Sequence, residues 1–337
     1  MPRLGRWPAA LVVSCLAALA GTAAASLVPK GRVQYVGAPT VLLPLAVSPA
    51  PTGPVRGPGL AMLASPELPR ELGLPAPLDP ALIERSAVGP LPRAAADGRI
   101  ALRHYARPGA ACDGACVGLI VTGLGLIEHT TLLALSLPPE VGLSFSPYAD
   151  AAAWQARARR QGHEVLLDLP LEPAHYPRDD TGPLTVPVAP RGLEVALSRA
   201  LAAGAGYVAL SAHAGAFSAA DASFAEVAQL LQQRGLGLIE LGGDALAGAA
   251  RAGGLPYAEA LGPVEADRSA EAFARALADF ETAALHGGAV LALVQPTPAG
   301  LDRLAAWLET LPAKGLRLAP PSRFMNDPGS TPAIARE

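Results

Sequence analysis

Short apolar runs alternate with longer amphipathic stretches from Asp97 onward, and this alternation narrows the possible folds more than any other feature of the sequence. The apolar runs span 117–121, 141–145, 164–167, 207–210, 237–240 and 289–294. The stretches of helical length between or after them span 151–161, 192–203, 222–234, 270–286 and 301–311. Runs that are apolar at nearly every position predict strands buried on both faces. Alternation with helices predicts a parallel sheet, either doubly wound or closed into a (β/α) barrel.

Polar or otherwise unusual residues follow the predicted strands. They are Thr122-Gly123, Ser146-Pro147-Tyr148, Asp168 to Glu172, Ser211-Ala212-His213 and Gln295-Pro296-Thr297. In (β/α) barrels the reactive residues come from these strand ends, which all lie at one mouth. The pattern therefore favours a barrel with a cleft. The first turn contains neither of the glycine motifs that hold nucleotide phosphates, so nucleotide binding has no support.

The first of these turns lies within GLIVTGLGLIEHTT, from Gly118 to Thr131. It reads as a buried strand that runs into a glycine-rich turn and then into a helix. Gly123 and Gly125 allow positive φ or a close approach of the backbone to a ligand. The turn itself contains no carboxylate, cysteine or lysine, although active sites are commonly found in such turns.

Length and charge limit the class of protein. The chain has 337 residues, of which 51% are hydrophobic, and this is enough for one barrel-sized core. A formal net charge of −3 and a pI near 6.1 argue against a nucleic-acid-binding protein, which normally has a basic face.

The N-terminus has the layout of a secretory signal. Arg3 and Arg6 precede an apolar run over residues 7–25, which ends in small residues suited to cleavage before Ser26. The alternative is an uncleaved anchor, because the run is close to the roughly 20 residues that span a bilayer. Both alternatives export the chain, so we expect a periplasmic or otherwise extracytoplasmic protein, tethered to the inner membrane if the anchor remains.

Proline and glycine crowd the segment after the leader, with no sustained period of a helix or strand. We expect residues 26–96 to form a largely disordered linker. The domain would then occupy residues 97–325, and residues 326–337 would form a flexible tail.

Cys112 and Cys116 are the two cysteines that remain after the leader. In an oxidising compartment, a disulfide that closes this short loop is expected. The alternative is a metal site, which would need two further ligands, and only His104 is close in sequence.

Six motifs, in order, carry a resemblance to a known family. They are GLIVTGLGL (118–126), GLSFSPYA (142–149), GHEVLLDLPLEP (162–173), GYVALSAHAG (206–215), RGLGLIE (234–240) and KGLRLAPPS (314–322). Over roughly residues 97–322 the chain resembles the divergent polysaccharide deacetylases, an exported branch of the NodB-like carbohydrate esterases. The resemblance implies a distorted (β/α) barrel and a metal-dependent deacetylase of a sugar polymer.

The resemblance also implies where a metal site would lie. Catalytic relatives hold a divalent metal such as zinc with an Asp-Asp pair after the first strand, and in this chain Thr122 and Gly123 occupy that place. Asp168 replaces a histidine of the fuller pattern, and His213 matches a histidine of the family. These two residues are the expected catalytic groups and metal ligands, with His213 equally open to a hydrogen-bonded role in the cleft wall. Because a catalytic zinc normally has three protein ligands, a third would come from Glu240, Glu265 or His175.

Five residues are expected to bind substrate: Thr122, Gly123, Tyr148, Glu172 and Gln295. Glu172 matches a family glutamate, and it either contacts sugar hydroxyls or caps a neighbouring turn. Gln295 lies where relatives have a histidine and, being an amide, cannot act as a general acid. Tyr148 and Tyr176 either offer flat faces to sugar rings or pack on the barrel rim.

Three functions stay open at this point. The first is a divergent deacetylase with a rearranged metal site. The second is a non-catalytic member that binds an envelope polysaccharide, such as a peptidoglycan-type glycan, or a protein. The third is a tethered structural piece of the envelope.

Overall fold

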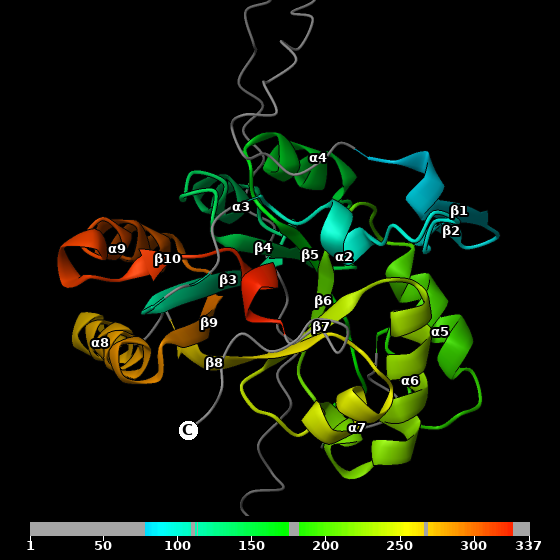
Figure 1. The fold of residues 1–337 in the computed structure, drawn as a ribbon. Helices are drawn as coiled ribbons and strands as arrows, with labels where there is room; N and C mark the ends of the chain where they lie inside the picture. The colour runs from blue at the N-terminus through cyan, green and yellow to red at the C-terminus, as the bar shows by residue number, and fades with distance from the viewer. Residues whose placement is uncertain (1–77, 109–111, 113, 175–181, 266–268, 326–337) are drawn as a thin grey trace, which may run out of the picture. The chain divides into compact units, whose positions relative to one another are not determined.

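A closed barrel of seven parallel strands forms the centre of the computed structural model (Figure 1). The structure describes residues 78–108, 112, 114–174, 182–265 and 269–325. The barrel strands are β3 (Cys116–Leu124), β4 (Gly142–Phe145), β5 (Val165–Asp168), β6 (Ala209–Ala212), β7 (Gly237–Leu241), β8 (Tyr257–Glu265) and β9 (Ala289–Gln295). Strands that follow one another in sequence pair with one another, and β9 pairs with β3 to close the ring. The predicted barrel is confirmed.

A further short strand, β10 (Arg317–Leu318), pairs with Cys116 and Val117 at the beginning of β3. The neighbouring strand β4 pairs with β3 only from Ile120 onward. Strands β10 and β4 therefore both pair with the edge of β3 that is opposite the edge paired with β9. The last segment of the described chain therefore returns to the end of the barrel opposite the carboxyl ends of the strands.

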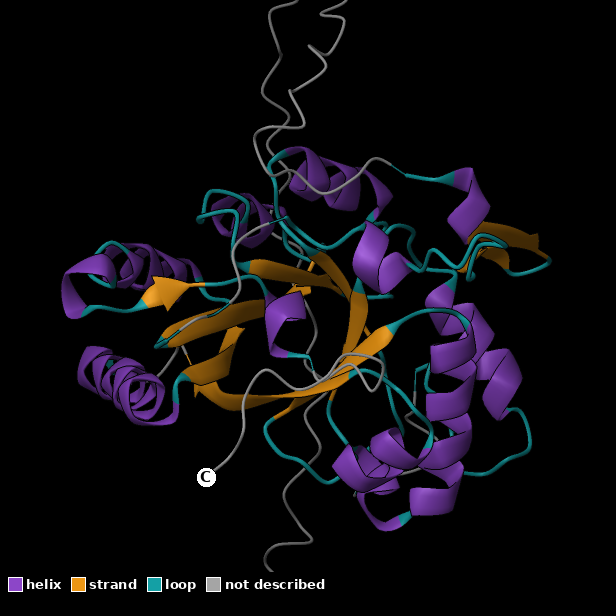
Figure 2. Cartoon of the chain, in the orientation of Figure 1, coloured by secondary structure: helices purple, strands orange, loops and turns teal. Residues whose placement is uncertain are grey.

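Helices surround the barrel on its outside (Figure 2). They are α3 (Glu128–Ala134), α4 (Ala152–Arg160), α5 (Leu193–Leu201), α6 (Asp221–Gln233), α7 (Ala247–Ala252), α8 (Ala270–Gly287) and α9 (Pro298–Leu308). Because helices cover one face of the sheet and the barrel interior covers the other, β4, β6 and β7 are buried at every position. Among the helices that the structure describes, none has the length and apolarity needed to cross a membrane.

Strand β8 was not among the strands predicted from apolar runs. Its sequence is interrupted by Gly262 and Pro263, and its pairing with β9 shifts register between Leu261 and Val264. Proline removes a ladder hydrogen bond, and glycine weakens the strand pattern, so both obscure the signal.

The prediction of a largely disordered linker over residues 26–96 is wrong for its last part. From Leu78 the chain is ordered: a 3-10 helix (Pro80–Leu82) leads into the antiparallel hairpin of β1 (Ile83–Ser86) and β2 (Gly89–Pro92). Leu82 and Leu91 are buried in the main core. Prolines are tolerated in β2 because it is an edge strand. The leader, residues 26–77 and the tail 326–337 lie outside the described residues.

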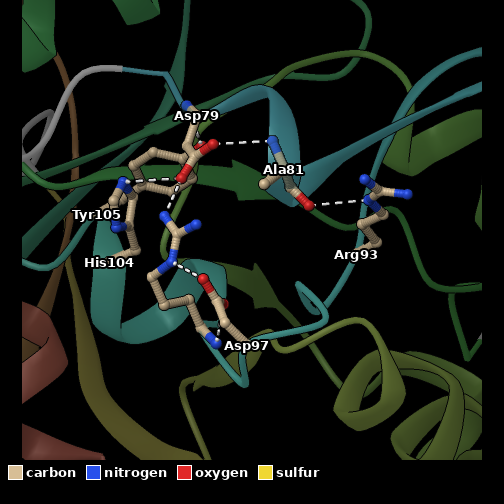
Figure 3. A network of polar contacts seen from close by, with 7 residues as sticks. Asp79, Ala81, Arg93, Asp97, His104 and Tyr105 are labelled. Atoms are coloured by element: carbon tan, nitrogen blue, oxygen red, sulfur yellow. Dashed lines mark hydrogen bonds and ion pairs between the residues drawn. The ribbon is translucent and has the colours of Figure 1, made fainter.

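Polar contacts around Asp79 hold this segment against the domain (Figure 3). The Asp79 carboxylate accepts a hydrogen bond from the Ala81 N–H at 2.8 Å and pairs with Arg99, which also binds Asp97 at 2.7 Å. The Asp79 N–H donates to the Tyr105 hydroxyl at 3.0 Å. The Ala81 N–H and Arg99 hold the pKa of Asp79 below its ordinary value. The helix α2 (Ala101–His104), just before Tyr105, is thereby joined to the hairpin.

The two cysteines are joined by a disulfide, Cys112–Cys116. The bond closes a loop directly before β3, the strand that leads to the mouth of the barrel. Both sulfurs are consumed, so this pair offers no thiolate to a metal.

His163 makes the stability of the fold depend on pH. Its ring is buried, and Nδ1 lies 2.9 Å from the Val141 carbonyl, so the neutral ring donates there. Burial lowers the pKa of His163 below 6.5. The unfolded chain therefore takes up a proton at a higher pH than the folded chain, and stability is lost as pH falls below about 6.5.

At pH values below about 6.5, we expect the free energy of unfolding of the wild type to fall more steeply than that of His163→Gln. The difference in slope should be up to about 1.4 kcal/mol per pH unit. Urea titrations at several pH values measure this difference. His286→Gln, at an exposed histidine of α8, is the control and keeps the wild-type slope. Equal slopes in the wild type and His163→Gln would contradict the assignment.

Candidate functional site

Asp168 is the centre of the polar groups at the mouth of the barrel. It ends β5, and its Oδ1 lies within hydrogen-bonding distance of the hydroxyl oxygens of Ser144 on β4, at 2.5 Å, and of Ser211 on β6, at 2.8 Å. Its Oδ2 accepts the Gly123 N–H at 2.9 Å. Burial raises the pKa of Asp168, although these donors act in the opposite direction. Every strand or turn around this carboxyl group contributes a hydrogen-bond donor to it.

The first turn supplies a backbone N–H where the resemblance places a carboxylate. Gly123 has a φ of 70°, in the left-handed region that favours glycine. In this conformation its N–H donates to Asp168, which lies 45 residues farther along the chain. Thr122 and Gly123 thus occupy the place expected for the family's Asp-Asp pair. They offer a hydroxyl group and a backbone amide there instead of two carboxylates.

His213 lies just beyond β6 and is exposed. Its Nδ1 is 2.9 Å from the Leu241 carbonyl, so in the neutral ring Nδ1 carries the hydrogen and Nε2 is an acceptor. A positive charge on His213 would lower the pKa of Asp168, which places the two residues in one electrostatic environment. The structure therefore brings Asp168, His213 and Gly123 together, as the sequence predicted.

A hollow of about 300 Å³ adjoins this group. It lies at the carboxyl ends of β3 and β9, and its lining includes Thr122, Gly123, Leu126, Ile127 and Gln295. Leu126 and Ile127 are 59% and 65% exposed. The hollow thus combines four neutral polar side chains, those of Thr122, Thr130, Thr131 and Gln295, with an apolar wall, which is the usual make-up of a small-molecule site.

Glu240 is not part of the mouth. Its carboxylate is buried and accepts hydrogen bonds from the N–H groups of Ala245 and Leu246, at 3.0 and 2.8 Å, and from the Tyr257 hydroxyl at 2.8 Å. In the ladder it pairs with Ala212, the neighbour of Ser211, so it points to the other face of the sheet. The expectation that Glu240 supplies a third metal ligand is wrong, because this carboxylate holds the loop before α7.

Glu172 takes the capping role rather than pointing freely into the hollow. Its Oε2 accepts the Val188 N–H at 2.9 Å, and its own carbonyl accepts the Ala216 N–H at 2.7 Å. Glu172 therefore ties two loops of the rim together.

Two other candidates, Tyr148 and Glu265, lie at or near the rim. Tyr148 is exposed, with its hydroxyl close to Gly182. Glu265 ends β8 and pairs in the ladder with Gln295. His175 and Tyr176 lie outside the described residues.

The arrangement at Asp168 does not fit a catalytic metal. Among the residues that the structure describes, no group of three His, Cys, Asp or Glu side chains could hold a metal ion. A zinc ligand must present lone pairs to the ion, whereas Ser144, Ser211 and the Gly123 N–H already occupy most of the hydrogen-bonding sites of the Asp168 carboxyl group. These residues are built to satisfy a carboxyl group, not to share it with a cation.

Ser144 was missed as a site residue by the sequence analysis, and Ser211 was named only as one of the residues that follow a predicted strand. Each is a single hydroxyl in an otherwise apolar strand, and both are buried. A buried polar residue requires a hydrogen-bond partner, so their presence in apolar runs was a usable signal. Their shared partner became visible only when β4, β5 and β6 were placed side by side.

Comparison with known proteins is consistent with this geometry. The chain matches a solved structure of an uncharacterized protein from Agrobacterium tumefaciens C58, with 29% identity and a TM-score of 0.65, over 69% of this chain and 98% of that one. The comparison with curated proteins finds no match. The family model described as divergent polysaccharide deacetylase matches residues 119–325, which contain the barrel from within β3 to the end of the described chain. By that match, this chain belongs to the divergent polysaccharide deacetylase family.

Proposed function

We propose that the mouth of the barrel binds a glycan of the cell envelope, such as peptidoglycan or a related polysaccharide, and does so without a catalytic metal. Membership of the family supports a carbohydrate-related function. The N-terminal leader, retained or cleaved, would deliver the domain to the periplasm, with a membrane tether if it is retained.

The hollow beside Thr122 and Gln295 carries the proposal. The Gln295 amide can both donate and accept hydrogen bonds, as can the Thr122 hydroxyl, and this suits the hydroxyl and acetamido groups of sugars. Leu126 and Ile127 offer exposed apolar surface for the C–H faces of a sugar ring. The family's carboxylate pair is replaced here by Thr122 and Gly123, so the features that remain are those of recognition.

A hydrolytic role is the second candidate, and His213 is the observation that favours it. The Leu241 carbonyl fixes its tautomer and leaves Nε2 as an acceptor at an exposed position. Such a ring can act as a general base. This candidate requires release of acetate from an acetylated glycan, and that release should disappear in His213→Ala.

Glycan binding is tested by calorimetric titration of the full chain with N-acetylglucosamine oligomers and with soluble peptidoglycan fragments. We expect saturable binding that weakens about tenfold in Gln295→Leu, because one hydrogen-bonding group, worth about 1.4 kcal/mol, is lost. The matched control is Gln233→Leu, at an exposed glutamine near the end of α6, which should bind as the wild type does. Wild-type protein that does not saturate with either probe, or an unchanged Kd in Gln295→Leu, would refute the proposal.

A further inference from the structure

Three oxygen atoms at the mouth of the barrel form a closed triangle. Ser144 Oγ lies 2.5 Å from Asp168 Oδ1, Ser211 Oγ lies 2.8 Å from the same oxygen, and the two hydroxyl oxygens lie 2.8 Å from each other. All three separations are within hydrogen-bonding distance. Ser144 and Ser211 are 0% and 1% exposed, so bulk water does not supply alternative partners for their hydroxyls.

The number of hydrogens available to this triangle depends on the state of Asp168. Each serine contributes one hydrogen. If Asp168 is ionised, two hydrogens serve three short oxygen–oxygen contacts, and one contact is left with lone pairs facing each other. If Oδ1 carries a proton, it donates to one serine and accepts from the other, so three hydrogens serve three contacts and the ring closes. The Gly123 N–H donates to Oδ2 in either state and does not alter the count.

We infer that Ser144, Asp168 and Ser211 form a closed ring of hydrogen bonds in which Asp168 is a neutral carboxylic acid and not a metal ligand. Ser144 and Ser211 are positioning residues for this acid. The ring engages Oδ1 as both donor and acceptor, and this agrees with the misfit between this mouth and the metal site that the family resemblance implies.

The surroundings of Asp168 agree with a neutral acid. The turn after β3 contributes the uncharged Gly123 N–H, β4 contributes Ser144, and the β6 segment contributes Ser211 and the titratable His213. Burial raises the pKa of Asp168 above 3.8, and His213 opposes this rise only when its ring is charged.

A neutral acid changes what the mouth can attract. It has no negative charge to draw a divalent cation, and it leaves the adjoining hollow suited to an uncharged ligand. The inference deepens the proposed glycan binding in this respect, but the ring itself does not depend on any ligand.

The sign of a pH dependence tests the ring. An acid whose folded pKa is raised contributes stability below its unfolded pKa and loses that stability as pH rises. The folding equilibrium constant of the full-length wild type, relative to Asp168→Asn, should therefore fall by up to tenfold per pH unit above about pH 4. Asparagine suits this comparison because its amide can donate to both serines while its oxygen accepts the Gly123 N–H.

Asp79→Asn is the matched control. The pKa of Asp79 is lowered, so the wild type should gain stability relative to that variant over the range in which Asp79 ionises. If the stability of the wild type relative to Asp168→Asn rises with pH, or does not change with pH, Asp168 is ionised and the inference is overturned.

Two measurements remain decisive if Asp168→Asn fails to fold. With the aspartate carboxyl carbons labelled with ¹³C, the infrared spectrum of the wild type at neutral pH should contain the carbonyl band of a protonated aspartic acid, and absence of that band overturns the ring. Added zinc should leave the unfolding temperature unchanged, and stoichiometric zinc that is lost in Ser144→Ala, Ser211→Ala or His213→Ala would overturn it too. Glycan affinity enters none of these readouts, so failure of the ring and failure of the proposed function are distinguishable.

Discussion

Glu164→Ala is expected to lower the free energy of unfolding by about 4 kcal/mol, because it removes a buried carboxyl group that accepts three hydrogen bonds. Glu164 is 0% exposed, and its carboxyl group accepts the N–H of Ser322, the hydroxyl of Ser322 and the N–H of Arg107. Burial raises the pKa of Glu164. These contacts join the beginning of β5 to the last turn of the described chain. Urea unfolding of the full chain, followed by circular dichroism, measures the loss.

Glu164→Gln separates the hydrogen bonds from the volume of the side chain. Glutamine has one carbonyl oxygen, which can accept the Ser322 N–H, while its amide group can donate to the Ser322 hydroxyl. The Arg107 N–H is then left without its acceptor, and an intermediate loss of about 2 kcal/mol is expected. If alanine costs no more than glutamine, the carboxyl group does not hold this end of the barrel.

Gly125→Val is expected to destabilise the fold by about 4 kcal/mol, since it adds backbone strain and overpacking at one position. Gly125 has a φ of 92°, which valine adopts only with strain. A Cβ there would also lie 2.9 Å from the Ala149 Cβ, closer than side-chain carbons approach each other. Its N–H donates to Thr131 at 2.9 Å, so the backbone cannot readily rotate away. Thermal and urea unfolding measure the cost.

The same turn supplies the control. Gly123 also has positive φ, but a Cβ at this position would meet nothing within 4 Å. Gly123→Ala should therefore show strain alone, about 1–2 kcal/mol. Equal losses of stability at the two positions would show that the contact with Ala149 is relieved by movement of the loop after β4, in which Ala149 lies. Wild-type stability in Gly125→Val would mean that the turn does not have the conformation described here.

The strand and helix pattern could be read from the sequence because burial on both faces makes strands almost wholly apolar. This held for β3, β4 and β7 and allowed the barrel to be predicted. It failed for β8, where Gly262 and Pro263 interrupt the run. It failed again for residues 78–96, because proline and glycine suggested a linker and the contacts that order the hairpin come from distant parts of the chain.

The candidate site was likewise predicted from the sequence only in part. Asp168, His213 and the turn at Thr122 and Gly123 were expected at one mouth because the carboxyl ends of parallel strands meet there. Glu240 was one of three candidates to join them and does not, since a difference of one residue along a strand turns a side chain to the other face. The roles of Ser144 and Ser211 could not be assigned, because a serine in an apolar strand shows that a partner exists but not which one.

The sequence by itself determined the alternation of buried strands with helices and favoured a barrel with its mouth at the polar strand ends, because local apolar periodicity and residue identity are sufficient for these. The family resemblance added the distorted barrel and the place of the carboxylate pair that this chain lacks. Only the tertiary structure decided that Asp168 is surrounded by donors and that Glu240 and Glu172 hold loops. Hydrogen-bond partners are chosen by distance and direction between strands that are far apart in sequence. The register of β4, β5 and β6 sets those distances, and that register results from closing the whole barrel.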